Sequence, residues 1–152
     1  MVNLLNLSDL TFLLAVRLDS IERLENTLAV TEYITSCFDA PVIVLESASY
    51  KNGLLEKLTC ENVRYVFHED HDSIFYRTKF LNQMIRLVQT SYTTIWDTDV
   101  IAPGEQINQA MELLKNGEAD FVYPYDKYFL MSFLSIFDQY PLIWLSRPNN
   151  LL

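Results

Sequence analysis

Short apolar runs alternate with helix-length segments along this chain. The runs have the length and composition of buried strands, and they predict strands at residues 11–16, 41–46, 64–67, 93–96 and 120–123. Strands separated by helices are typical of βαβ units, which build a parallel sheet. The pattern therefore predicts an α/β fold, with a twisted, mostly parallel sheet and helices on both of its faces.

Three of the intervening segments have helical periodicity. The first begins at Asp19, with Glu22 three residues later in a capping-box spacing. The second, at residues 77–89, is apolar almost all round, which suits a helix covered on more than one side. The third, at residues 105–115, is stopped by Asn116 and Gly117. The predicted buried residues are Ile21, Leu24, Leu28, Thr31 and Phe38 in the first segment and Ile107, Ala110, Met111 and Leu114 in the third.

Composition narrows the class of protein. The 152 residues fit a single domain, and because half of them are hydrophobic, intrinsic disorder is excluded. The formal net charge of −9 repels nucleic acid and anionic lipid, so a phosphorylated ligand would need local cations or a divalent metal. Cys37 and Cys60 lack the spacing of a zinc or redox site and are interpreted as reduced residues in or near the core. No basic leader or membrane-length run is evident, which favours a cytoplasmic protein.

Candidate chemistry lies where the strands end, because ligands of such sheets bind beyond the carboxyl ends of the strands. The strand predicted at residues 93–96 runs directly into Asp97 and Asp99. In extended backbone, carboxylates two residues apart point to the same side and could share one cation. Mg²⁺ and Mn²⁺ prefer such oxygen ligands and keep positions open for substrate phosphates. The pair therefore predicts a metal site.

Two further charged segments allow more than one interpretation. The run His68-Glu69-Asp70-His71-Asp72 contains a second Asp-x-Asp, but consecutive residues cannot all converge on one ion, so a solvated loop is predicted. Arg77 and Lys79 lie at the start of a predicted helix, where cations oppose the macrodipole. A bound anion would explain these cations, and ion pairing with the acidic run at residues 69–72 is the alternative.

Taken together, these segments resemble a known family. They are Val16-Arg17-Leu18-Asp19-Ser20 after the first strand, Glu46 at the end of the second, Arg77-Thr78-Lys79 at a helix start, and Trp96-Asp97-Thr98-Asp99-Val100. Their order is similar to that of nucleotide-sugar glycosyltransferases of the GT-A type, in particular the bacterial family-two and galactosyltransferase-like enzymes. The resemblance spans about residues 10–125 and implies the Rossmann-like architecture of nucleotide-diphospho-sugar transferases.

The resemblance also implies a role for each position. Arg17, Asp19 and Glu46 would lie near the base and ribose, and Arg77 or Lys79 would contact the diphosphate. Asp99 would ligate Mn²⁺ or Mg²⁺, with Asp97 directed toward the ribose or the metal. The implied activity is metal-dependent sugar transfer from a nucleotide sugar, UDP-sugar first, to a hydroxyl of a glycan or other acceptor, in the assembly of surface polysaccharide or glycoconjugate.

The C-terminal part departs from the family pattern. Family members continue into an acceptor-binding half with a catalytic carboxylate, whereas here residues 126–152 form an apolar tail. Asp126 is the candidate base, and a turn residue is the alternative interpretation. The tail aromatics predict a homodimer or packing on a missing region. These are Tyr128, Phe129, Phe133, Phe137, Tyr140 and Trp144.

Other functions remain open from the sequence. A non-catalytic or truncated nucleotide-sugar-binding domain is the main alternative, because fold does not establish activity. A receiver-like regulatory module has similar size and acidity but needs an acidic pair after the first strand, where Arg17 stands. A sugar nucleotidyltransferase needs a glycine-rich loop at that place, and the chain has no glycine before Gly53.

Overall fold

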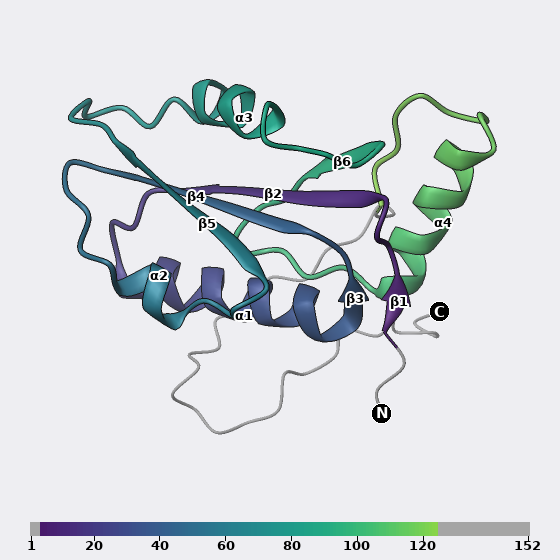
Figure 1. Ribbon diagram of the computed structural model, residues 1–152, viewed down its shortest axis with the longest axis horizontal. Coiled ribbons are helices and arrows are strands. Elements are labelled where there is room, and N and C mark those ends of the chain that lie inside the picture. The colour runs from purple at the N-terminus through teal and green to yellow at the C-terminus, as the bar shows by residue number, and fades with distance from the viewer. Residues whose placement is uncertain (1–3, 125–152) are drawn as a thin grey trace, which may run out of the picture.

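A four-stranded parallel sheet forms the centre of the molecule (Figure 1). The computed structural model describes residues 4–124. The strands are β2 (Leu10–Val16), β4 (Val42–Ala48), β5 (Val63–Glu69) and β6 (Tyr92–Ile95), in the order β5-β4-β2-β6. Four of the five predicted strands are thus confirmed, with small shifts at their ends. A two-residue parallel pair, β1 (Leu5–Asn6) with β3 (Phe38–Asp39), was not predicted.

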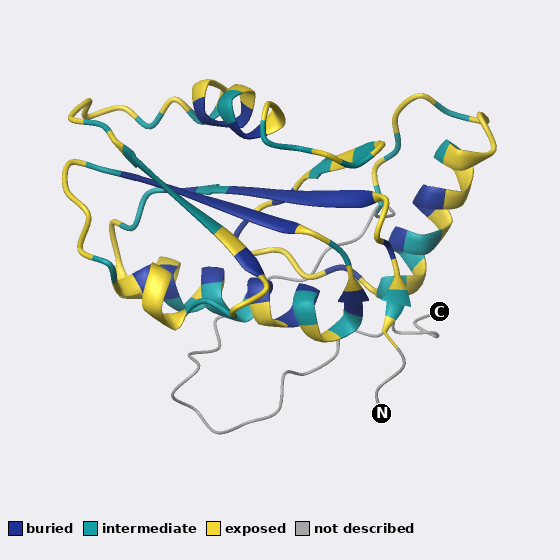
Figure 2. Cartoon of the chain, viewed as in Figure 1, coloured by how far each residue is buried: buried dark blue, intermediate teal, exposed yellow. Residues whose placement is uncertain are grey.

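Helices cover both faces of the sheet, as predicted. In Figure 1, α1 (Ile21–Cys37) and the short α2 (Leu54–Leu58) lie on one face and α3 (Arg77–Ile85) on the other. α4 (Gly104–Lys115) lies beside β1. Successive side chains of β2 point to opposite faces of the sheet, which explains why the core has two layers. Phe12 and Leu14 belong to the cluster that includes residues of α1. Leu13 packs on the other face with Phe80 and Met84 of α3. Figure 2 shows that burial is concentrated in β2 and β4, the central strands.

The start of α1 differs from the prediction by one residue. Ser20 is the N-cap, in extended backbone, and its hydroxyl accepts a hydrogen bond from the backbone N–H of Arg23 at 3.2 Å. Asp19 lies outside the helix and pairs with the Arg23 side chain instead, at 2.8 Å. Ile21, predicted to be buried, is exposed because it begins the helix on its solvent side, and Phe38 is buried in β3 rather than in the helix.

The helix that begins at Arg77 is shorter than the predicted range of residues 77–89. α3 ends at Ile85, and Leu87 continues in a turn in which its backbone N–H donates to the carbonyl of Met84. Leu87 and Val88 still pack against the core, but from the connection to β6. Because Ile85 is exposed, α3 is covered on one side only, and the prediction of burial on several sides is wrong.

The strand predicted at residues 120–123 is also wrong. These residues follow α4 as irregular backbone, and Phe121 and Tyr123 are exposed, with their rings in an edge-to-face contact at 4.7 Å. An apolar run forms a strand only where a neighbouring strand completes its hydrogen bonds, and no described strand pairs with this run. The prediction for α4 is confirmed, including the burial of Ile107, Ala110 and Met111, whereas Leu114 is only partly buried.

The strand order distinguishes the Rossmann-like fold from the receiver-like alternative. Taken in sequence, the strands of the main sheet have the order 3-2-1-4, which is the order of a Rossmann-like half-sheet. Receiver-like domains place their first strand between the second and third, so that alternative is contradicted by the sheet. Within residues 4–124, no helix combines the length and the apolar character needed to cross a bilayer.

Candidate functional site

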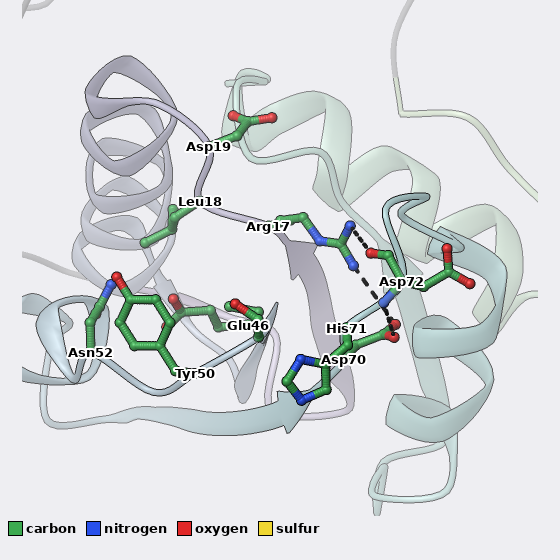
Figure 3. A pocket seen from close by; sticks show the side chains of 11 residues that line it. Arg17, Leu18, Asp19, Glu46, Tyr50, Asn52, Asp70, His71 and Asp72 are labelled. Atoms are coloured by element: carbon green, nitrogen blue, oxygen red, sulfur yellow. Dashed lines mark hydrogen bonds and ion pairs between the residues drawn. The ribbon is translucent and has the colours of Figure 1, made fainter.

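A hollow of about 340 Å³ lies at the carboxyl ends of β2, β4 and β5 (Figure 3). Val16 is in register with Glu46, so the residue that follows β2 lies beside the end of β4. Arg17, Asp19 and Glu46 all line this hollow. The resemblance implies a common ligand site for these three residues, and the structure brings them together in one hollow.

Glu46 is almost fully buried in the hollow, with 1% of its surface exposed. The Tyr65 hydroxyl, from the neighbouring strand β5, donates a hydrogen bond of 2.6 Å to Oε2 of Glu46. The other oxygen, Oε1, is buried and has no hydrogen-bond partner among residues 4–124. Burial, followed by the hydrogen bond to the Glu46 carboxylate, raises the pKa of Tyr65, so the hydroxyl stays protonated and acts as the donor.

Arg17 is held at the opposite wall of the hollow by the segment after β5. Its Nη1 donates to the backbone carbonyl of Asp72 at 2.8 Å, and its Nη2 lies 3.7 Å from Oδ2 of Asp70. The guanidinium carbon lies 5.5 Å from the centre of the Phe75 ring. Nε and Nη2 are buried and make no hydrogen bond with any described residue. Apart from the ion pair of Nη2 with Asp70, these two nitrogens and Oε1 of Glu46 are thus buried polar atoms without a hydrogen bond to any described residue.

Asp70 differs from the solvated loop residue that the sequence predicts. Its side chain is only 9% exposed, and Lys79 approaches its Oδ2 at 3.4 Å, on the same carboxylate that faces Arg17. The backbone N–H of Asp72, and then the Lys79 ammonium, lower the pKa of Asp70. His71 pairs with Glu69 in an exposed contact instead, and no group of three potential metal ligands comes together in the described part of the chain.

The cations of α3 are both paired with carboxylates. Lys79 contacts Asp70, which is the alternative that the sequence left open, and Arg77 forms an ion pair with Asp97. Neither cation lines the hollow of Figure 3. The predicted contact of Arg77 or Lys79 with a diphosphate therefore stays a prediction.

Asp97 and Asp99 do not have the geometry assumed for a shared cation. Thr98 and Asp99 form a turn after β6, so the extended backbone assumed in the prediction is wrong. Asp97 is turned toward Arg77, whereas Asp99 lines a second hollow of about 160 Å³. This smaller hollow lies at the start of α1 and is also lined by Ser20, Glu22, Arg23, Asn26 and Thr98.

The ion pair between Asp19 and Arg23 connects the two hollows. Asp19 lines the larger hollow and Arg23 the smaller one, and the Arg23 side chain together with its charge lowers the pKa of Asp19. The two hollows therefore lie on either side of this ion pair. Asp99 makes no hydrogen bond or ion pair with another residue of the described segment, which leaves its carboxylate free for a ligand.

Several residues at or beside the larger hollow were not predicted from the sequence. Tyr65, which bonds to Glu46, is one of several apolar residues in its strand, and only the pairing of Val44 with Tyr65 reveals that it lies diagonally next to Glu46. Tyr50 and Asn52 line the hollow and follow β4 without a motif. Asp126 and the aromatic residues from Tyr128 to Trp144 lie outside the described residues.

Cys37 and Cys60 are free thiols, as predicted. No known family model matches this chain, and no curated protein matches it. The function is therefore inferred from the geometry of the two hollows and from the resemblance of the site residues.

Proposed function

We propose that this chain binds a nucleotide-diphosphate sugar across the two hollows and transfers the sugar to an acceptor hydroxyl, as a GT-A type glycosyltransferase. The observation that supports the proposal most is the meeting of Arg17, Asp19 and Glu46 in one hollow at the carboxyl edge of the sheet. This edge is where ligands bind in sheets of this class. The volume of about 340 Å³ is in the range of small-ligand pockets.

The charges suggest which part of the nucleotide each hollow receives. The larger hollow contains the carboxylates of Asp19, Glu46, Asp70 and Asp72 and one guanidinium, Arg17. Such a surface repels phosphate but offers acceptors to the N–H and O–H groups of a base and a ribose. Tyr50 stands at one side of the hollow in Figure 3, where its exposed ring is available for stacking on a base.

The smaller hollow suits the diphosphate. It lies at the N-terminus of α1, where backbone N–H groups and the positive end of the helix dipole attract anions. Arg23 adds a cation that it shares with Asp19, and because Glu22 and Asp99 line the same hollow, a diphosphate there would need the metal as well. In this proposal Mn²⁺ or Mg²⁺ is held by the free carboxylate of Asp99 together with phosphate oxygens of the ligand. The metal would neutralise the charge of the departing diphosphate.

The transfer step of the proposal depends on the resemblance rather than on the described site. A general base would remove the proton of the acceptor hydroxyl, and the candidate Asp126 lies outside residues 4–124. A non-catalytic nucleotide-sugar-binding domain is the alternative, because it would have the same two hollows and no base. Homodimerisation through the tail and a cytoplasmic location stay predictions.

Titration calorimetry of the full chain with UDP and with UDP-sugars tests the proposal. We expect binding in the presence of MnCl2, weaker binding in EDTA, and at least about a tenfold loss of affinity for Asp99→Ala. Asp39→Ala is the matched control, because Asp39 is an exposed carboxylate in β3, away from both hollows. Release of UDP from UDP-sugar with an acceptor would support transfer, and binding without release would support the non-catalytic alternative. Absence of binding in every condition would contradict both.

A further inference from the structure

The turn that carries Asp99 is fastened to the core by the residue that precedes it. Residues 97–100 form this turn, in which the backbone N–H of Val100 donates to the carbonyl of Asp97 at 3.4 Å. The Trp96 side chain is buried, and its Nε1 donates a hydrogen bond of 2.9 Å to the carbonyl of Val100. The turn is thus held by a core side chain as well as by its own backbone.

The ring of Trp96 is itself fixed by packing. It lies edge-on against Phe12 of β2, with ring centres 5.4 Å apart, and Phe12 is fully buried. The backbone N–H of Trp96 also donates to the carbonyl of Leu13 at 2.9 Å, which continues the pairing of β6 with β2. Because side chains in a closely packed core keep defined rotamers, the indole N–H is a fixed donor for the carbonyl of Val100.

A second hydrogen bond holds the chain just beyond the turn. The Tyr33 hydroxyl of α1 donates to the carbonyl of Ala102 at 2.8 Å, and both residues are buried. Burial raises the pKa of Tyr33 to about 12, so the hydroxyl stays protonated and remains a donor at neutral pH. Since α1 also supplies residues to the smaller hollow, this bond connects the segment that follows the turn to the helix that forms the other wall.

The turn presents two polar side chains to the smaller hollow, Thr98 and Asp99. Thr98 is only 8% exposed, and its hydroxyl makes no hydrogen bond with any described residue. Its oxygen is nevertheless not among the fully enclosed side-chain atoms of the described residues, so it keeps accessible surface. Because buried hydroxyl groups are normally hydrogen-bonded, the free Thr98 hydroxyl indicates a ligand in this hollow, next to the free carboxylate of Asp99.

We propose that Trp96 and Tyr33 are positioning residues that hold this turn in place, so that its two polar side chains face the smaller hollow. Neither aromatic residue lines either hollow, and both act through the backbone of the segment that they bond. This inference rests on the proposed function, since the ligand assigned to the smaller hollow is a diphosphate with its metal ion. A carboxylate can contribute to metal binding only if its supporting contacts hold it in the productive place.

The dependence of UDP affinity on Mn²⁺ separates positioning from a general loss of structure. Titration calorimetry of the full chain gives the dissociation constant of UDP in MnCl2 and in EDTA, and the ratio of the two isolates the contribution of the metal. In the wild type we expect UDP to bind about tenfold or more tightly in MnCl2 than in EDTA. In Asp99→Ala the two affinities should be nearly equal.

Two variants each remove one of the anchoring hydrogen bonds. Trp96→Phe keeps an aromatic ring but loses the donor to Val100, and Tyr33→Phe loses only the hydroxyl group. In both variants we expect the gain from MnCl2 to fall to about threefold or less, while the UDP affinity in EDTA stays within about twofold of the wild type. Tyr92→Phe is the matched control, because Tyr92 packs against the same core and its hydroxyl bonds no described residue. This control should keep the wild-type gain.

The possible outcomes distinguish this inference from the proposed function. If UDP binds to the wild-type chain in neither condition, both are overturned. If UDP binds equally well in MnCl2 and in EDTA, nucleotide binding stands, and the metal role of the turn is overturned together with this inference. If the wild type depends on Mn²⁺ and a variant that is folded by circular dichroism keeps the full gain, the positioning role of the residue changed in that variant is overturned. Tyr33→Phe removes a single oxygen atom and tests the anchoring of the turn even where Trp96→Phe does not fold.

Discussion

Arg77, the first residue of α3, forms an ion pair with Asp97, which follows β6. The sequence assigned these residues to different tasks, a diphosphate contact and a metal ligand. In the structure these two residues, 20 positions apart in the sequence, neutralise each other where α3 begins and β6 ends. A ligand that recruits either residue must therefore break this pair or bind beside it.

The Arg77–Asp97 pair should contribute little to stability. Both side chains are substantially exposed, at 42% and 54%, and exposed pairs typically contribute less than about 1 kcal/mol. We expect Arg77→Gln and Asp97→Asn each to lower the free energy of unfolding by less than about 1 kcal/mol in urea titrations. A loss above about 2 kcal/mol would mean that the pair holds α3 in place.

Asp70 should make stability depend on pH in the acidic range. Its folded pKa is lowered by the backbone N–H of Asp72 and by Lys79, so the unfolded chain binds the proton more readily. The contribution is present above the unfolded pKa of about 4 and is lost as the pH falls through the lower folded value. We expect Asp70→Asn to be less stable than the wild type at pH 7, with the difference narrowing toward pH 2 in urea titrations. A difference that stays constant over this range would contradict the assignment.

The start of α1 offers a test of the capping residue. Because Ser20 accepts the hydrogen bond from the backbone of Arg23, Ser20→Ala should cost about 1 kcal/mol. Asp19→Ala removes only an exposed ion pair and should cost less than about 0.5 kcal/mol. Thermal or urea unfolding of the two variants measures both losses of stability. A larger loss for Asp19→Ala than for Ser20→Ala would indicate that Asp19 is the N-cap, as the sequence predicts.

We expect α3 to be held against the sheet by its buried face alone. Phe80 is fully buried and stacks on Phe75 with ring centres 5.1 Å apart, so Phe80→Ala should cost about 3–5 kcal/mol. Ile85→Ala is the control on the same helix, because its side chain is exposed and its loss should cost less than about 1 kcal/mol. Equal losses for the two variants would indicate that α3 is covered on two sides.

The sheet could be predicted from the sequence because its central strands are buried on both faces. Continuous apolar runs such as Leu10–Val16 leave few other structures for the chain. Residues 120–123 show the limit of this reasoning, since a strand also needs a neighbouring strand, which lies far away in sequence. The same limit explains the missed pair of β1 and β3.

The site could be predicted only in part, for a related reason. Arg17 and Asp19 lie just after β2, and Glu46 lies two residues before the end of β4, so their meeting follows from the parallel sheet. The partners of these residues depend on register, which no local pattern shows. Tyr65 meets Glu46 because β5 pairs with β4, and the Asp70 side chain is largely buried because Arg17 and Lys79 converge on it.

The most direct test of the nucleotide site is to locate the bound ligand by NMR. The full chain, labelled with ¹⁵N, is titrated with UDP in the presence of MgCl2, and backbone amide shifts are followed. We predict that the largest shifts lie at residues 17–20, 46–52 and 70–72, around the larger hollow, with smaller shifts at residues 98 and 99. Absence of shifts at millimolar UDP, or shifts centred on α4, would contradict a nucleotide site at the carboxyl edge of this sheet.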